Sequence, residues 1–178
     1  MKHFNKKFLL LIIFITISCE KESRYKIGQE FEGGIIFYID ASNLHGLIAA
    51  PSDQGDSIAW GCETMNLIGS DETKIGKGLQ NTIDIVNGCT SPDFAARICY
   101  DLVLNGYDDW YLPSKDELNL MYLRKDIIGN FSGIHPAPYW SSSEFKNEFA
   151  AWRQDFTNGE QTIYDKYNMY HVRAMRSF

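Results

Sequence analysis

Residues 106–118 read GYDDWYLPSKDEL, and this stretch carries the clearest local structure signals in the chain. Trp110-Tyr111-Leu112 is typical of a short buried strand, which Pro113 ends because proline has no N–H to donate to a sheet. Ser114 to Glu117 match the S-x-x-E capping box of a helix start. Leu118, Met121 and Tyr122 follow at helical spacing. We therefore predict a strand, a turn and a helix whose apolar stripe packs on the core.

Two strands, a loop and two helices are predicted upstream of this stretch. Gly34 to Asp40 (GIIFYID) and His45 to Ala50 (HGLIAA) are apolar runs on either side of a polar turn, which is typical of paired strands. Pro51 to Thr73 is polar, so we expect a long surface loop, pinned by Trp60. Gln80 to Asn87 is expected to form a helix ending at Gly88. Ser91-Pro92-Asp93 predicts a second helix start, because a hydroxyl cap, a proline and an acid are N-terminal signals.

The sequence after residue 139 favours β-structure. Tyr139 to Ser143 and Ala150 to Phe156 are candidate strands, and Asn158-Gly159 predicts a tight hairpin that returns through Gln161 to Tyr164. His171 to Phe178 is expected to be a last strand, paired with the first strand around residues 35–39. The predicted fold class is α+β, with two or three helices packed on a mostly antiparallel sheet and the N- and C-terminal strands adjacent.

The first residues have the features of a bacterial lipoprotein signal. Lys2, Lys6 and Lys7 precede an apolar run, and Ser18-Cys19 follows it at once. The run is shorter than the roughly 20 residues that span a bilayer, although an uncleaved anchor is the alternative interpretation. We expect a signal peptide over residues 1–18, lipidation of Cys19, a tether over 19–26 and one domain over 27–178.

Charge and cysteine content limit the function classes. Without residues 1–18 the chain keeps 14 Lys and Arg against 23 Asp and Glu, a net charge of −9. Such an acidic domain is a poor nucleic-acid or anionic-polysaccharide binder, since phosphate binding relies on basic side chains. Cys62, Cys89 and Cys99 permit one internal disulfide, and the sequence leaves three pairings open. We favour Cys89–Cys99, which would cross-link neighbouring helices, and no cysteine has metal-site spacing.

Several motifs in a fixed order resemble the Lcl C-terminal domain family. They are GGIIFYID, HGLIAA, AWGC, IGKGLQNT and AARIC, then GYDDWYLPSKDEL, YWSSSE (Tyr139 to Glu144), AW and VRAMRSF (Val172 to Phe178). The resemblance covers about residues 27 to 178. It implies a C-type-lectin-like fold and a binding or adhesion module on a bacterial surface. WYLPSKDEL also looks like a segment of formylglycine-generating enzymes, but Cys62, Cys89 and Cys99 do not sit at that family's cysteine positions.

The resemblance also implies where a ligand would bind. In such a fold the paired chain ends form a rigid base, and binding is expected on loops at the far side of the sheet. This places Trp140, Ser143, Glu144, Trp152 and Arg153 around the ligand-binding surface. Their rings, hydroxyl, carboxylate and guanidinium suit a neutral or cationic partner, such as a glycan or a surface protein. The alternative interpretation is that the tryptophans are buried in the core and contact no ligand.

The sequence offers no recognisable catalytic or metal-binding constellation. It contains no H-E-x-x-H motif, no G-x-S-x-G elbow and no calcium-lectin run around its isolated histidines and serines. We therefore expect no cofactor, no metal and no enzymatic activity, with an envelope enzyme on the same fold as the alternative. The expected location is the bacterial cell envelope, lipid-anchored, at the outer membrane or cell surface.

We predict that Cys19 is the acylated first residue of the mature protein, because a basic start and an apolar core lead directly to Ser18-Cys19. Mass spectrometry of protein extracted from membranes should find an N-terminal cysteine carrying acyl chains. An N-terminus that still begins at Met1 would contradict this prediction. So would a Cys19→Ser protein with the same membrane association as the wild type.

Overall fold

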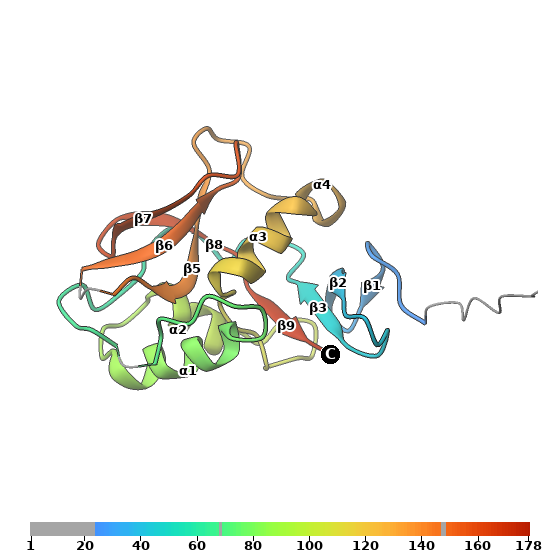
Figure 1. Cartoon of the computed structure of the whole chain (residues 1–178), viewed down its shortest axis with the longest axis horizontal. Helices are drawn as coiled ribbons and strands as arrows, with labels where there is room; N and C mark the ends of the chain where they lie inside the picture. The colour runs from blue at the N-terminus through green and yellow to red at the C-terminus, as the bar shows by residue number, and fades with distance from the viewer. Residues whose placement is uncertain (1–23, 68, 147–148) are drawn as a thin grey trace, which may run out of the picture.

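The computed structural model describes residues 24–67, 69–146 and 149–178. The expected signal peptide and Cys19 lie outside the described residues. The described chain forms two β-sheets with helices packed against them (Figure 1), which confirms the α+β class predicted from the sequence.

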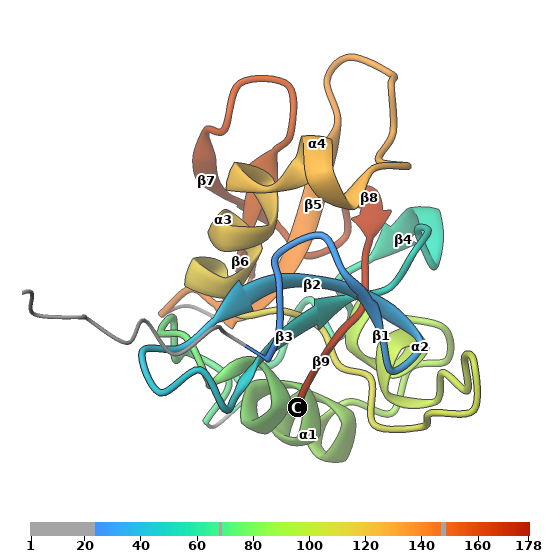
Figure 2. The same cartoon turned by 90° about the vertical axis from the view of Figure 1, so that its right-hand side faces the viewer.

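The first sheet brings together the two ends of the described chain. The expected strand pair forms as β2 (Gly34–Ile39) and β3 (Gly46–Ala49), with Ile36 opposite Ile48. β1 (Glu30–Phe31) pairs with β2, and the C-terminal strand β9 (Met175–Ser177) pairs with β3. The terminal strands therefore share one sheet, as predicted. Their expected direct pairing is wrong, because the sheet order is β1-β2-β3-β9 and β3 lies against β9 (Figure 2).

The second sheet lies to the left of the first in Figure 1 and has the order β4-β8-β5-β6-β7. Its pairs are antiparallel except for β5 and β8, which are parallel. Residues 51–73 were expected to form only a loop but contain the edge strand β4. The hairpin predicted around Asn158–Gly159 is present, with a longer connection over residues 156–160. The strands are β4 (Gly55–Ala59), β5 (Pro138–Glu144), β6 (Ala150–Asp155), β7 (Gln161–Asp165) and β8 (Met169–Val172).

The predicted last strand is divided between the two sheets. β8 ends at Val172 and β9 begins at Met175, so Arg173 and Ala174 form the crossing. The buried Arg173 guanidinium donates to the Asp53 carboxylate at 2.6 Å and to the carbonyls of Ala50 at 2.9 Å and Asn130 at 2.6 Å. The single-strand prediction is wrong here because these partners are distant in sequence and give no local signal.

In the described part of the chain four helices pack on the sheets, and the first agrees with the sequence analysis. The second starts later than Ser91 predicts, because Asp93 has a φ of +49° and the cap position falls on Phe94. The Ser91 hydroxyl instead lies 3.6 Å from the Cys62 sulfur. Trp110 to Leu112 contributes one bridge, between Tyr111 and Met175, rather than a full strand. The helices are α1 (Gly78–Gly88), α2 (Ala95–Tyr100), α3 (Lys115–Leu123) and α4 (Lys125–Ile128).

The predicted capping box of α3 is confirmed and extends to α1. The Ser114 hydroxyl accepts the Glu117 N–H, and Glu117 Oε2 accepts the Ser114 N–H at 2.8 Å. The same carboxylate accepts the N–H groups of Gly76 at 2.8 Å and Gly78 at 3.2 Å, where α1 begins. Burial raises the pKa of Glu117, and the backbone donors oppose that rise. One side chain thus fixes the starts of two helices.

The disulfide differs from the favoured pairing. Cys62 and Cys89 are joined, with their Cα atoms 5.6 Å apart. Cys99 is a free thiol, fully buried in the core on the inner face of α2. The Cys89–Cys99 prediction is wrong because Cys89 follows the end of α1 in an extended conformation and meets the loop after β4 instead. The disulfide indicates an oxidising, extracytoplasmic compartment.

Two apolar clusters form the core. One contains Trp60, Trp110 and Trp140 with α1 and α2, and the other contains Tyr139, Phe156 and the inner face of α3. All three tryptophans are fully buried or nearly so, as the alternative of core packing predicts. Across residues 24–67, 69–146 and 149–178, no helix has the length and apolar character needed to cross a membrane.

We predict that Ser114→Ala lowers the free energy of unfolding by about 0.5–2 kcal/mol, the usual cost of a lost helix cap. The hydroxyl also donates to the Lys74 carbonyl at 2.9 Å, which favours the upper part of this range. Chemical denaturation should measure the loss. Lys77→Ala is the matched control, since Lys77 caps α1 without a side-chain hydrogen bond and its loss should change stability little. Equal stability of both variants would contradict the assigned role of Ser114.

Candidate ligand-binding surface

Three of the five predicted ligand contacts lie inside the protein. Trp140 is fully buried on β5, and its indole N–H donates to the Ile58 carbonyl at 3.0 Å. The Ser143 hydroxyl donates to the Glu72 carbonyl at 2.7 Å and accepts the Lys115 N–H at 3.0 Å. These two side chains are enclosed and hydrogen-bonded within the fold. Their predicted contact with a ligand is therefore wrong, and for Trp140 this removes ring stacking.

Glu144 forms a buried ion pair instead of a surface carboxylate. Its Oε1 accepts a short hydrogen bond from the Lys166 ammonium, and both side chains are almost fully buried. Oε2 accepts the Leu67 N–H at 3.0 Å and the Ser70 hydroxyl at 2.9 Å. The ammonium also lies 4.7 Å from the centre of the Trp60 ring. Glu144 therefore joins β5 to the loop after β4 and is not available to a ligand.

Trp152 and Arg153 are half-buried neighbours on β6 and point to opposite faces of the sheet, because successive strand side chains alternate. The Lys115 ammonium lies 4.3 Å from the Trp152 ring, which is therefore covered in part by the start of α3. Arg153 lies on the other face, with its guanidinium 4.3 Å from the Tyr164 ring and 5.2 Å from the Tyr170 ring. The structure thus separates the two residues that the sequence placed together.

Arg153 has unused hydrogen-bonding capacity. Among the described residues, its buried Nε has no hydrogen-bond partner. Thr162 lies directly opposite on β7, and its buried hydroxyl is also unpartnered among the described residues. Buried polar groups normally have partners, so this pair is unusual. We define the Arg153 face as Arg153, Thr162, Tyr164 and Tyr170.

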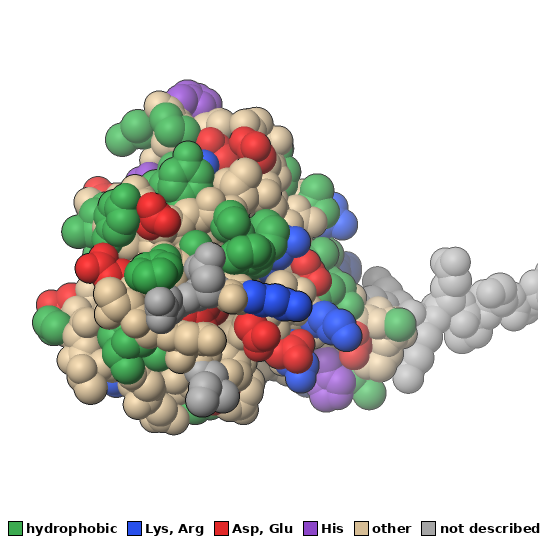
Figure 3. All heavy atoms as spheres, turned by 60° about the vertical axis from the view of Figure 1, so that its left-hand side comes forward, with side chains coloured by type: hydrophobic (Ala, Val, Ile, Leu, Met, Phe, Trp, Pro, Cys, Tyr) green, Lys and Arg blue, Asp and Glu red, His purple; other side chains and the backbone are tan. Residues whose placement is uncertain are grey.

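The Arg153 face lies in a region with large exposed apolar side chains. Tyr164 of β7, which belongs to the face, and Tyr167, in the turn between β7 and β8, are both exposed. Figure 3, which brings the left-hand side of Figure 1 forward, shows hydrophobic side chains in separate groups with acidic side chains between them. Aromatic surface beside a cation with unused donors is suited to polar ligands that also present an apolar face.

The sequence analysis proposed Arg153 but did not identify its tyrosine partners. The Asn158-Gly159 hairpin signal could have indicated Tyr164. The hairpin register places Tyr164 opposite Ala151, whose side chain points to the same face of the sheet as that of Arg153. Tyr170 reaches the same face from β8, which is separated from β6 by β5. No local pattern in the sequence indicates that approach.

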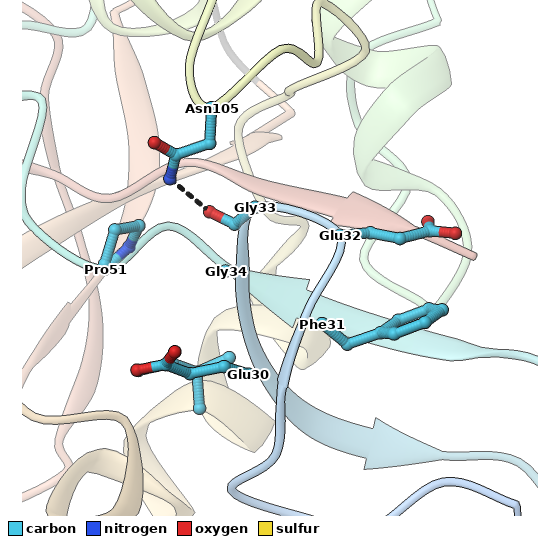
Figure 4. Close-up of a pocket in the computed structure, with 8 residues that line it drawn as sticks. Glu30, Phe31, Glu32, Gly33, Gly34, Pro51 and Asn105 are labelled. Atoms are coloured by element: carbon cyan, nitrogen blue, oxygen red, sulfur yellow. Dashed lines mark hydrogen bonds between the residues drawn. The ribbon is translucent and has the colours of Figure 1, made fainter.

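A separate pocket of about 380 Å³ lies beside the β1–β2 turn. Figure 4 shows the Asn105 amide nitrogen pointing at the Gly33 carbonyl, a hydrogen bond of 2.7 Å, while Glu30 and Pro51 flank the opening. Much of the remaining lining is backbone, and the Glu32 carboxylate is paired with Arg176 at 2.8 Å. The pocket lacks the combination of rings and unused donors that Arg153 provides.

Among residues 24–67, 69–146 and 149–178, no three His, Cys, Asp or Glu side chains are grouped closely enough to hold an ion. The Cys99 thiol is buried, which raises its pKa and keeps it protonated.

Comparison with known proteins identifies a family. The family model for the Lcl C-terminal domain matches residues 51–176, which is more than half of the chain. A search of curated proteins found no match. The matched segment contains the α3 capping box, the Glu144–Lys166 pair and the whole Arg153 face.

We predict that Glu144→Ala lowers the free energy of unfolding by about 3–5 kcal/mol, because it leaves the Lys166 charge buried without its carboxylate. Thermal and urea unfolding should measure the loss. A Glu144→Ala, Lys166→Met double variant should be more stable than the single variant, since it removes both charges. If the single variant unfolds like the wild type, the ion pair is not structural.

Proposed function

Since this chain belongs to the Lcl C-terminal domain family, we propose that it is a membrane-anchored surface lipoprotein with a non-catalytic binding domain. The observation that carries this proposal is the Arg153 guanidinium, which lies near two tyrosine rings while its Nε has no acceptor among the described residues. Lipidation at Cys19 and a surface location complete the proposal. The Cys62–Cys89 disulfide supports a location outside the cytoplasm.

The geometry favours a polar ligand with an apolar face, and a glycan has this character. The exposed Tyr164 ring offers apolar contact, and the guanidinium supplies hydrogen-bond donors in a fixed plane. The two rings restrict the rotamers of Arg153, so less conformational entropy is lost when it binds. A surface protein that presents carbonyl or carboxylate acceptors could use the same donors.

Side chains that could serve a hydrolytic enzyme are engaged in structural bonds. The Ser141 hydroxyl donates to the Trp152 carbonyl at 2.9 Å, and the Ser143 hydroxyl to the Glu72 carbonyl. Glu117 accepts three backbone N–H groups at helix starts, and Glu144 is paired with Lys166. These structural roles support the proposal that the domain binds a ligand without chemically changing it.

We predict that Arg153→Ala weakens ligand binding at least about tenfold, which corresponds to about 1.4 kcal/mol. Purified protein would be screened on a glycan array and against envelope proteins, and the strongest ligand titrated with each variant. The melting temperature should fall only modestly, because the variant loses two ring contacts but no buried ion pair.

Arg24→Ala is the matched control, since Arg24 is an exposed arginine in the predicted tether, outside both proposed surfaces. Its affinity should equal that of the wild type. Equal losses in both variants would indicate general charge attraction and overturn the assignment to the Arg153 face. Recovery of a cleaved or modified ligand after incubation would contradict the non-catalytic role.

A further inference from the structure

An apolar groove lies between β2 and α3, where the tether joins the domain. Its volume is about 530 Å³. Phe37 and Ile39 of β2 form one wall, and Leu120 and Leu123 of α3 form the other. Ile27, the first residue of the predicted domain, also lines the groove. The junction of tether and domain is therefore part of the groove itself.

The rim of the groove exposes large apolar side chains to solvent. Leu123 is 62 % exposed, Ile127 on α4 is 46 % exposed and Ile27 is 36 % exposed. A side-chain carbon added at Gly28 would lie 2.9 Å from Ile127, so the rim residues from the tether junction and from α4 are neighbours. Contiguous exposed apolar surface in a soluble domain is a mark of an interaction site.

The predicted anchor keeps this groove close to a bilayer. Cys19 precedes Ile27 by eight positions. Even a fully extended chain spans only about 3.3–3.6 Å per residue, so the acylated cysteine must lie within about 29 Å of the groove. This step rests on the lipidation included in the proposed function.

We propose that the groove and its rim dock onto the phospholipid bilayer that holds the acyl chains of Cys19. Leu123, Ile127 and Ile27 enter the boundary between headgroups and acyl chains, as the apolar side chains of interfacial helices do. Arg124 lines the groove with an exposed guanidinium, which suits lipid phosphate at the same depth. The occupant of the groove is therefore lipid.

This docking orients the candidate binding surface. In Figure 1, β1 and the tether junction lie toward one end of the long axis, and β6 and β7 lie at the other end. Figure 2 views the molecule from the tether end and shows β2 crossing below α3 and α4. With the groove on the bilayer, the Arg153 face points away from the membrane and toward ligands in solution.

Site-directed spin labelling of the lipidated protein in phosphatidylcholine vesicles would test the proposal. The label is placed at Leu123→Cys, with Ile163→Cys on β7 as the matched control, because both positions are exposed. The native Cys99 does not interfere, since it is fully buried. We expect contact of the 123 label with a water-soluble nickel chelate to fall about tenfold on membrane binding, while its contact with oxygen rises. The 163 label should not change.

Three outcomes would overturn the proposal. The 123 label could stay as accessible to the chelate as the 163 label in vesicle-bound protein, which would mean that the groove faces water. It could be shielded equally in the Cys19→Ser protein without vesicles, which would mean that another part of the chain fills the groove. Shielding of the 163 label alone would mean docking through the opposite end. Mass spectrometry of Cys19 and the Arg153→Ala titration report separately on the anchor and on ligand binding.

Discussion

The buried carboxylate of Glu117 is the constraint on which the arrangement of the helices depends. It accepts backbone N–H groups from Ser114, Gly76 and Gly78, so the starts of α1 and α3 converge on one side chain. A carbon added at Gly78 would lie 2.3 Å from the carboxylate oxygen, which explains why glycine begins α1. A buried carboxylate is tolerated only with such donors, because desolvation otherwise disfavours its charge. The backbone N–H groups at the two helix starts account for the burial of this acid.

The same principle distinguishes structural charges from the candidate binding residue. Arg173 is paired with Asp53 at the crossing between the sheets, Arg176 with Asp109 and Glu32, and Lys166 with Glu144. Each pair joins segments far apart in sequence. Arg153 has ring contacts but no carboxylate among the described residues. This difference is the reason that Arg153, and not one of the paired arginines, is proposed as the binding residue.

The two proposed surfaces lie toward opposite ends of the long axis (Figure 1). The apolar groove is at the tether junction, where a lipid anchor would hold it near a bilayer. The Arg153 face is formed by β6, β7 and β8 at the far end. A rigid scaffold between them is supplied by the two sheets, which share the chain from Val172 to Met175. In the proposed arrangement, ligand binding and membrane anchoring use separate surfaces.

The sequence by itself determined the elements whose signals are local: the S-x-x-E cap, the strand pair over residues 34–50, the 158–159 hairpin and the family motifs. It also pointed to Arg153. Only the tertiary structure decided which predicted site residues were accessible, because burial of Trp140, Ser143 and Glu144 depends on segments distant in sequence. It likewise decided that Cys89 meets Cys62 and that the last strand divides at Arg173. These contacts join residues that are far apart in the sequence, so no local sequence pattern predicts them. They arise from the way the chain crosses between the sheets and from side-chain packing.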